Sequence, residues 1–190
     1  MREKIIDAAI AEFTLNGLKF TMSDLAKSLG ISKKTIYTVF DSKQSVLLGI
    51  ADRYAADFER MQAELEADDE LDPVIKLERL LCALPEKYHD IGLSRIYELA
   101  EKYPKPYKHL MACVNHGWEL AEEYIKKGIN EGRISDVSVP VVMAMVKGTV
   151  HVYMETDVLL KNGLTYEQGK EEMVKILMKG ILKGERSKGN

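Results

Sequence analysis

Three lysines stand close together in the stretch GISKKTIYTVFDSK, residues 30–43. Lys33 and Lys34 fall where one helix is expected to begin, and Lys43 is expected as the second residue of the next helix. A helix N-terminus carries a partial positive charge, so the helix dipole opposes each lysine there by about 0.3–1 kcal/mol. The free backbone amides and the ammonium groups together form a site for an anion such as a phosphate. The pattern therefore favours phosphate binding over ordinary surface charge.

Short helices are expected to position these lysines. Apolar residues recur at helical spacing from Ile6 to Phe13 and predict a first helix over residues 2–16, which ends at the Asn16-Gly17 pair. Thr21, followed three residues later by Asp24, is typical of a capping box and opens a second helix that ends at Gly30.

Two further caps follow. Ser32 is expected to cap a third short helix, and Asp41 with Gln44 is expected to cap a fourth. Three short helices with a glycine in the turn before the third form a helix-turn-helix, whose helix after the turn lies in the major groove of DNA. Lys33 and Lys34 would then open the recognition helix, which gives the unfavourable charges a purpose.

Composition and charge agree with a globular DNA binder. The chain has 190 residues, 46% of them hydrophobic and 30% charged, as in soluble proteins that are rich in helix formers. The net charge of −3 argues against a protein that coats nucleic acid by bulk attraction. Residues 1–48, however, hold seven Lys or Arg against five Asp or Glu, a net +2, and the rest of the chain carries −5.

The sequence predicts a cytoplasmic protein without a membrane span. Its N-terminus is charged at once, with no apolar run of the signal-peptide kind. The most apolar segment, residues 139–146, contains Pro140 and is far shorter than the roughly 20 residues that a span requires. Cys82 and Cys113 lie among apolar residues, which indicates reduced core thiols more than a disulfide or a metal site.

The N-terminal quarter of the chain, from Ile5 to Leu47, resembles the tetracycline-repressor (TetR) family. Residues that stand at the family's spacing are Ala8-Ala9, Phe13, Gly17, Thr21, Leu25-Ala26, Gly30, Ser32, Thr35, Tyr37, Phe40 and Lys43. The resemblance implies that Thr21, Met22 and Ser23 start the helix that straddles the DNA backbone. It also implies that Lys33, Lys34, Thr35, Tyr37 and Thr38 face the groove, and that Lys43 clamps a phosphate. Lys34 and Thr38-Val39 depart from the family's usual residues, which bears on the operator sequence.

The rest of the chain is also expected to be helical. Apolar residues from Val46 to Leu65 recur at helical spacing and predict a long helix over 42–66, which ends in the acidic stretch 64–72 before Pro73. Further helices are expected over 73–89, 91–103, 105–132, 138–160 and 165–183. The predicted fold is therefore all-α with about nine helices. A helix-turn-helix domain, residues 1–48, is joined by a long helix to a helical effector-binding and dimerisation domain, residues 49–190.

The last two long helices are expected to form a dimer. Apolar residues surround most of the 138–160 helix, so it needs cover on two sides, and glycines in 165–183 permit close approach of another helix. The predicted interface residues are Val142, Val146, Val150, Met173, Leu177 and Gly180. The resemblance also implies this four-helix interface, and the alternative is a buried pair within one chain. A dimer would place two recognition helices about 34–36 Å apart on a palindromic site.

A small-molecule effector is the second expected partner. The residues expected to bind it are aromatic, methionine and isolated polar side chains on apolar helices: Tyr97, His116, Trp118, Met143, His151 and Tyr153. Each alone would suit an ordinary core, but together they are consistent with an apolar cavity that has a few polar groups. The resemblance implies an effector pocket in this domain, with the 42–66 helix as the lever between pocket and DNA.

Two other classes of function are open alternatives. A helical-bundle enzyme or metal-binding protein would use pairs such as Glu86 with His89, but a di-iron site needs that motif twice and it occurs once. An architectural DNA binder without an effector would leave the C-terminal helices without a purpose. We therefore expect a dimeric repressor, not an enzyme, that binds a double-stranded DNA operator and is released by a small-molecule ligand, with no cofactor, metal or membrane partner.

Overall fold

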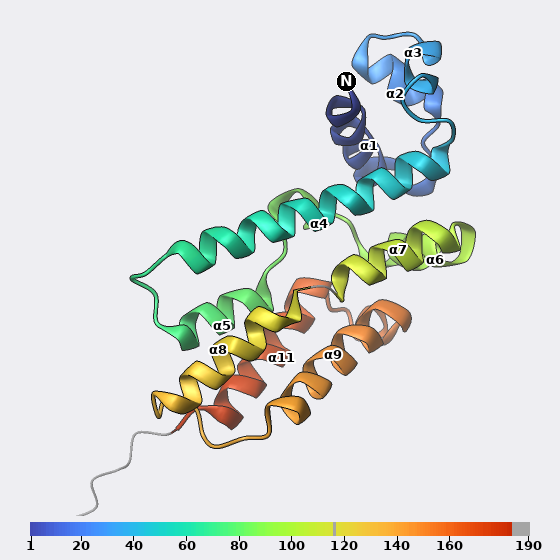
Figure 1. Ribbon diagram of the computed structural model, residues 1–190. Helices are drawn as coiled ribbons and strands as arrows, with labels where there is room; N and C mark the ends of the chain where they lie inside the picture. Colours follow the sequence, from blue (N-terminus) through green and yellow to red (C-terminus); the bar gives the residue numbers. More distant parts are fainter. Residues whose placement is uncertain (116, 184–190) are drawn as a thin grey trace, which may run out of the picture. The chain divides into compact units, whose positions relative to one another are not determined.

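The computed structural model describes residues 1–115 and 117–183, and within them the predicted all-helical fold is confirmed (Figure 1). These residues form eleven α-helices, two short 3-10 helices and one isolated bridge between Ile134 and Leu182. The helices are α1 Arg2–Asn16, η1 Gly17–Lys19, α2 Met22–Leu29, α3 Lys33–Tyr37, α4 Lys43–Ala67, α5 Pro73–Cys82, η2 Glu86–Tyr88, α6 Leu93–Lys102, α7 Pro104–Val114, α8 Trp118–Asn130, α9 Val139–Glu155, α10 Val158–Lys161 and α11 Tyr166–Ile181.

The chain divides into two compact units. The first unit consists of Met1–Glu59 and Leu84–His116, and the second of Arg60–Ala83 and Gly117–Asn190. The division runs through α4, so one helix belongs to both units. The sequence-based boundary at residues 48 and 49 stays a prediction.

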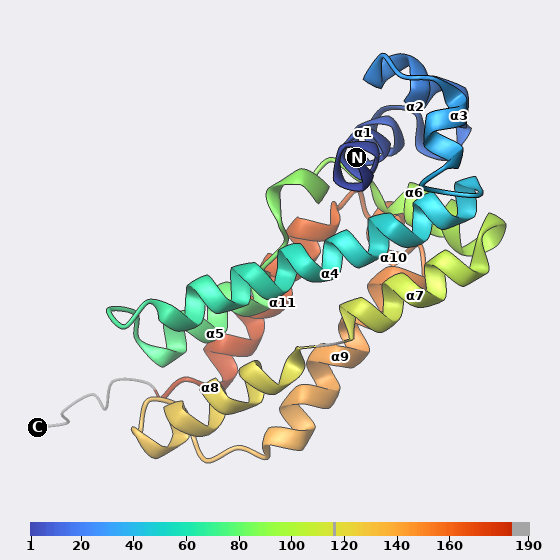
Figure 2. The ribbon, with the colours of Figure 1, turned by 45° about the horizontal axis from the view of Figure 1, so that its top comes forward.

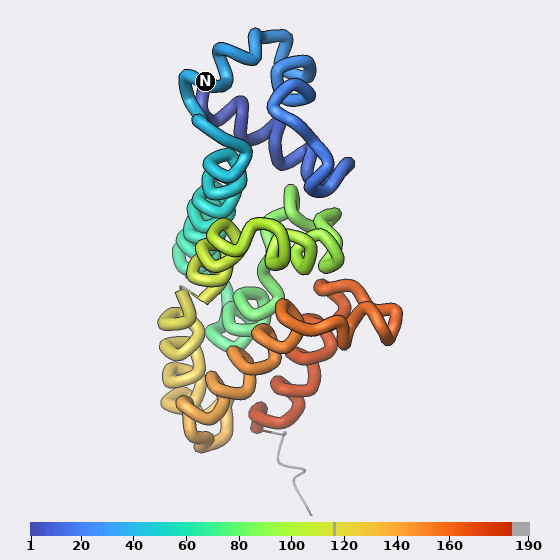
Figure 3. Tube along the Cα trace, turned by 90° about the vertical axis from the view of Figure 1, so that its right-hand side faces the viewer, coloured from blue at the N-terminus to red at the C-terminus, as the bar shows by residue number. Residues whose placement is uncertain are grey.

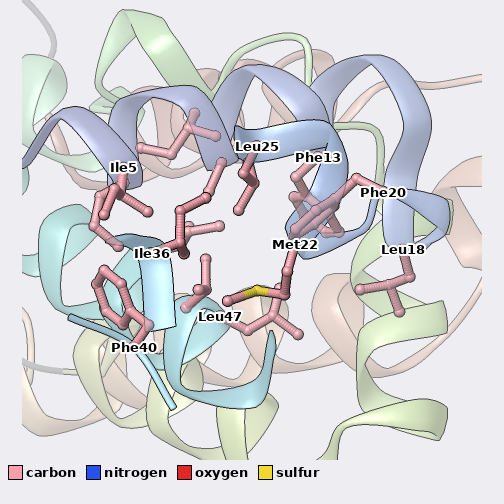
Figure 4. Packing of buried hydrophobic residues seen from close by; sticks show 14 of the residues in the cluster. Ile5, Phe13, Leu18, Phe20, Met22, Leu25, Ile36, Phe40 and Leu47 are labelled. Atoms are coloured by element: carbon pink, nitrogen blue, oxygen red, sulfur yellow. The ribbon is translucent and has the colours of Figure 1, made fainter. Parts of the chain in front are cut away.

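The first unit is built around one apolar core beneath the helix-turn-helix. Helices α1, α2 and α3 lie together at the start of α4 (Figure 2). Ile5, Leu25 and Ile36 are completely buried, and each comes from a different one of the three short helices (Figure 4). Tyr88 of η2 and Leu99 of α6 join the same core. Helices α1, α2 and α3, which we call the head, are therefore held by side chains from both parts of the first unit.

The second unit is a bundle of α5, α8, α9 and α11. Helix α5 packs against α8 and α11, and α9 packs against α11 and α8. Figure 3 shows α9 in orange beside α11 in red, with α8 in yellow. Leu77, Ile125, Val146 and Val174 supply one fully buried or nearly fully buried side chain from each of these four helices.

Buried lysines close two helix ends in the second unit. The ammonium group of Lys76 donates to the carbonyl of Glu66 at the end of α4, over 2.9 Å. The ammonium group of Lys170 donates to the carbonyl of Ala83, which follows α5, over 2.5 Å. A helix C-terminus carries a partial negative charge, so these contacts compensate part of the cost of burying the two cations.

Local sequence signals correctly predicted most of the helix ends near the N-terminus. The first helix spans residues 2–16 as predicted, and the Thr21–Asp24 capping box is present. The cap of α4 is a correction: Ser42 and Ser45 exchange hydrogen bonds between side chain and backbone, at 3.1 and 3.2 Å, in place of Asp41 and Gln44. Lys43 is consequently the first residue of α4 rather than the second.

The predicted long helices beyond residue 73 are shorter. The 105–132 prediction is wrong because α7 ends at Val114 and Gly117 takes the left-handed conformation, with φ 84°, before α8. The 73–89 helix ends at Cys82, where Ala83 and Pro85 are extended. The 138–160 helix ends at Glu155, where Thr156 is extended. In the part of the chain that the structure describes, no helix is both long and apolar enough to cross a membrane.

Candidate nucleic-acid interface

Helix α2 begins at a fully formed cap. The Thr21 hydroxyl accepts hydrogen bonds from the backbone N–H groups of Ser23 and Asp24, both at 3.2 Å. In return the Asp24 carboxylate accepts from the Thr21 backbone N–H at 2.8 Å. Hydrogen bonds from Thr21, first from its side chain and then from its backbone, hold the pKa of Asp24 below its ordinary value. The start of α2 is therefore fixed without any DNA bound.

The turn between α2 and α3 depends on Gly30. Its φ of 64° lies in the left-handed region, which costs glycine little and other residues more. The N–H of Ile31 donates back to the carbonyl of Ala26 at 3.0 Å and closes the end of α2. Ser32 then caps α3 through a 3.0 Å hydrogen bond from the Thr35 N–H. This is the geometry of a helix-turn-helix.

Helix α3 turns one apolar residue inward and its cations outward. Ile36 is completely buried and anchors the helix in the core. Lys33, Lys34 and Tyr37 are exposed, and the Lys33 ammonium lies 5.8 Å from the centre of the Tyr37 ring. A cation within about 6 Å of an aromatic ring is attracted to its face. This pair therefore presents a positive charge and a flat apolar surface together.

Other polar groups of α3 are used within the chain. The Thr35 hydroxyl lies 2.8 Å from the Ser32 hydroxyl, and the Thr38 hydroxyl donates to the Thr35 carbonyl at 2.7 Å. These two side chains would have to give up a local hydrogen bond to contact a base. Lys33, Lys34 and Tyr37 carry no such cost.

Lys43 is held inside the first unit. Its ammonium group donates to the carbonyls of Leu18, at 2.5 Å, and Phe20, at 2.6 Å, and lies 4.2 Å from the centre of the Phe20 ring. Burial lowers the pKa of Lys43. Two of its three N–H donors are thus committed to the segment between α1 and α2. The phosphate-clamp role stays a prediction, and these contacts favour a structural role instead.

Of the predicted contacts at the start of α2, Met22 differs most from the expectation. It is 6% exposed and packs in the core (Figure 4), whereas Thr21 and Ser23 are exposed. The first helical residue after a cap can point inward, and an apolar side chain there is buried. Lys27, which is not among the predicted contacts, is exposed one turn after Ser23. The i, i+4 spacing from Ser23 is the signal that would have found it.

The predicted effector residues lie in different places. Tyr97 is on α6 in the first unit, and His116 lies outside the described residues. In the second unit Met143 is 2% exposed, whereas His151, on the same helix, has a side chain that is 59% exposed. Trp118 opens α8.

The polar groups of this set differ in their partners. The indole N–H of Trp118 is buried and has no hydrogen-bond partner among the residues that the structure describes. The Tyr153 hydroxyl donates to the carbonyl of Gly169 at 3.3 Å, and His151 pairs with Glu155 at 3.2 Å. Among the described residues, no group of three or more His, Cys, Asp or Glu could hold a metal ion. The effector-binding set stays a prediction.

The predicted dimer residues divide into two groups. Val142, Val146 and Val150 are 5, 2 and 3% exposed, so they pack within their own unit and are not available to a partner. Leu177 is also buried, Met173 is half-buried, and Gly180 is exposed with no atom near the position of an added Cβ. The exposed apolar residues of α9 are others: Val141 at 58%, Met145 at 60% and Val152 at 44%.

These residues form a stripe on α9. With Gly148, which has open space around it, Val141, Met145 and Val152 follow the helical spacing i, i+4, i+7, i+11 and form what we call the α9 seam. On α11, Ile176 is 63% exposed and lies one turn before Gly180. Gly169 is used differently, because a Cβ there would lie 2.8 Å from Leu159 of the same unit.

The chain is similar to known transcription regulators. Residues 5–50 match the family model described as bacterial regulatory proteins, tetR family. The HTH-type transcriptional regulator YvaF of Bacillus subtilis is 22% identical over 187 residues, which is 98% of each chain.

Two solved structures share the fold. A transcriptional regulator from Saccharomonospora viridis in complex with choline has a TM-score of 0.70 at 20% identity, over 96% of this chain and 98% of that chain. The regulator FadR from Bacillus subtilis in complex with stearoyl-CoA has a TM-score of 0.65 at 20% identity, over 95% of this chain and all of that chain, 100%.

A capped helix-turn-helix with exposed cations on its last helix is the mark of a DNA-binding transcription regulator, and this chain is one rather than an enzyme. More narrowly, its residues 5–50 match the model of the bacterial regulatory proteins, tetR family.

Proposed function

We propose that the protein is a cytoplasmic repressor that binds a palindromic DNA operator as a homodimer and is released by a small-molecule effector. The exposed Lys33, Lys34 and Tyr37 on α3 carry this proposal, because they are free to meet phosphates and base edges. Phosphate contacts supply affinity, and contacts to base edges supply sequence preference.

The exposed apolar surface of the last two long helices supports the homodimer. The α9 seam and Ile176 of α11 would gain by leaving water, at about 25 cal/mol for each Å² of apolar surface buried. Gly148 and Gly180 have open space where a side chain would stand, so a partner backbone could approach closely at both. A dimer with two heads then suits a palindrome whose half-sites lie about one helical turn apart.

The continuity of α4 supports release by an effector. This helix starts directly after the recognition helix and continues into the second unit, so a change in one unit can reach the other through it. The relatives with bound choline and stearoyl-CoA show that neighbours of this fold take small molecules. The buried indole N–H of Trp118, which has no partner within residues 1–115 and 117–183, is a donor that an effector oxygen could satisfy.

Selection of bound duplexes from random-sequence DNA tests the proposal. We expect a palindromic site, because two equal heads read equal half-sites. Substituting Lys34→Ala or Tyr37→Ala should change the selected half-site, whereas the control Lys4→Ala, an exposed lysine of α1, should leave it unchanged. Recovery of no preferred sequence, or of a single unrepeated half-site, would contradict the proposal.

A thermal-shift screen separates an effector-responsive repressor from an architectural DNA binder. A ligand that binds only the folded protein stabilises it by about 2.7 kcal/mol at one hundred times its Kd. We expect at least one apolar or cationic small molecule to raise the melting temperature and to release the selected duplex. Stabilising molecules that all leave DNA affinity unchanged would favour the architectural role.

A further inference from the structure

Asp57 of α4 is a buried carboxylate in the first unit. It is 4% exposed and accepts hydrogen bonds from the Tyr88 hydroxyl at 3.0 Å and the Arg53 guanidinium at 3.3 Å. The Lys87 ammonium lies 3.0 Å from the same carboxylate. Burial alone would raise the pKa of Asp57, but hydrogen bonds from Lys87 and Tyr88 outweigh it and hold the pKa below its ordinary value. The carboxylate is therefore charged and fully engaged.

Arg53 extends this cluster to the DNA-binding head. Its guanidinium forms ion pairs with Glu3 and, at 3.5 Å, with Asp7, both on α1. The same guanidinium pairs with Asp57 one turn further along α4. A continuous set of charges thus joins α1, α4 and the segment that contains η2, all within the first unit.

A second link runs parallel to the first. Asp52, the residue before Arg53, pairs with Arg2 of α1 at 3.3 Å and with His109 of α7 at 2.7 Å. Its side chain is 51% exposed, so water and salt weaken these contacts. Both links join α1 to α4, and in both the carboxylates or cations on α1 are exposed, but the α4 carboxylate of the first link, Asp57, is buried whereas Asp52 is not. The Asp57 link should therefore carry most of the coupling.

None of these charged groups belongs to the helices expected to meet DNA, yet they determine where those helices lie. Helix α1 packs against α2, and α2 packs against α3, so the direction of α1 on α4 sets the direction of the recognition helix. Removal of one partner from a buried charged cluster leaves the others without compensation, which favours rearrangement. The apolar core can still hold the head folded, because Ile5, Ile6 and Phe13 of α1 are buried in it.

We propose that Asp57 is a positioning residue for DNA binding: through Arg53 it holds α1, and through Lys87 and Tyr88 it holds the η2 segment, on one stretch of α4. Loss of this positioning should weaken binding to the palindromic site more than binding to random DNA. This inference rests on the proposed homodimer, in which two heads must meet two half-sites at a fixed spacing, so a small rotation of each head would harm binding to the palindromic site. Random DNA, which each head contacts through phosphates alone, tolerates the rotation.

The test compares the full-length variants Asp57→Asn and Glu59→Gln. Both lie on α4 and lose one negative charge, but Glu59 is exposed. The measurement is the ratio of affinities for the selected duplex and a random duplex of equal length, by fluorescence anisotropy. Asp57→Asn should reduce this ratio about tenfold, within the usual range for coupled sites. Glu59→Gln should leave it unchanged, and the slope of affinity against salt should be the same for both variants.

A merely structural role would give a different result. Loss of folded protein lowers the affinity for both duplexes in parallel, so an unchanged ratio for Asp57→Asn overturns the proposal. If Asp57→Asn does not fold, Tyr88→Phe removes one 3.0 Å hydrogen bond from the same carboxylate and should reduce the ratio in the same direction. An unchanged ratio for that variant would likewise overturn the proposal. Hydrogen exchange should also quicken in residues 2–16 and not in 118–130.

Discussion

Lys43 makes contacts within the chain that favour a structural role over a direct contact with DNA. Its ammonium joins the first turn of α4 to the carbonyls of Leu18 and Phe20, which lie just before α2. Two half-buried hydrogen bonds to a charged donor are worth about 1.5–3 kcal/mol each. The residue therefore determines how α2 begins relative to α4, and any effect on DNA follows from that.

Substituting Lys43→Ala separates this role from a phosphate clamp. We expect a loss of about 3 kcal/mol in the free energy of unfolding, because two carbonyls lose their donor. Urea unfolding measures it. The slope of log affinity against log salt should stay the same, whereas loss of a phosphate contact would reduce it by about 0.9. A reduced slope with an unchanged free energy of unfolding would instead support the role of Lys43 as a phosphate clamp.

Lys170 gives the stability a pH dependence. Burial lowers the pKa of this amine to about 8, whereas an unfolded lysine has a pKa of about 10.4. Between these values the unfolded chain binds more protons than the folded chain, so the contribution of Lys170 to stability rises with pH. Below pH 8 both states are protonated, and the full cost of the buried charge remains.

The expected outcome is that the free energy of unfolding of the wild type rises from pH 8 to 9.5 relative to that of Lys170→Met. One pKa unit corresponds to about 1.4 kcal/mol, so the wild type should gain about 2 kcal/mol relative to the variant over this window. Lys175→Met is the control, because Lys175 is exposed on the same helix. A pH-independent difference for Lys170→Met, measured by urea unfolding, would contradict the assignment.

At the scale of the element, α9 decides whether the proposed dimer forms. Substituting Met145→Glu places a charge in the middle of the α9 seam, where a partner would have to bury it. We expect the variant to sediment as a monomer. Ile75→Glu makes the same chemical change at an exposed apolar position of α5 and should remain dimeric. A dimeric Met145→Glu variant would place the interface elsewhere.

Element boundaries could be predicted where one residue decides them. The Thr21 cap and the left-handed Gly30 depend on local hydrogen bonds and backbone freedom, so the sequence is sufficient for both. The break at Gly117 escaped prediction because apolar residues keep helical spacing across it, and periodicity takes no account of a single residue's φ. The cap of α4 escaped because Asp41, Ser42, Gln44 and Ser45 offer competing pairs.

The direction in which a side chain faces was harder to predict than the presence of the helix that carries it. Helix α9 is apolar around most of its circumference, so its sequence does not distinguish the core face with Val142 and Val146 from the seam with Met145. Met22 was assigned to DNA by its place in a motif, but its burial depends on packing against residues distant in sequence. Contacts such as those of Lys43 and Asp57 join residues 23 to 31 positions apart, which periodicity does not detect.

At the scale of the whole molecule, a chain with a net charge of −3 binds a polyanion through a small positive region. Residues 1–48 carry a net +2, and their exposed cations lie on α1, η1, α2 and α3. Affinity should therefore depend on a few phosphate contacts and fall steeply with salt. An acidic remainder of the chain would also disfavour non-specific coating of DNA.

Binding to duplex DNA over a range of salt concentrations tests this account most directly, with the whole chain compared to a variant that carries both Lys33→Ala and Lys34→Ala. We expect the wild type to bind at low ionic strength, and the slope of log affinity against log salt to fall in the variant by about 0.9 for each phosphate contact that the two lysines make. Equal affinities and equal slopes for the two proteins, or no binding by the wild type at low salt, would contradict the assignment of α3 as the DNA-reading helix.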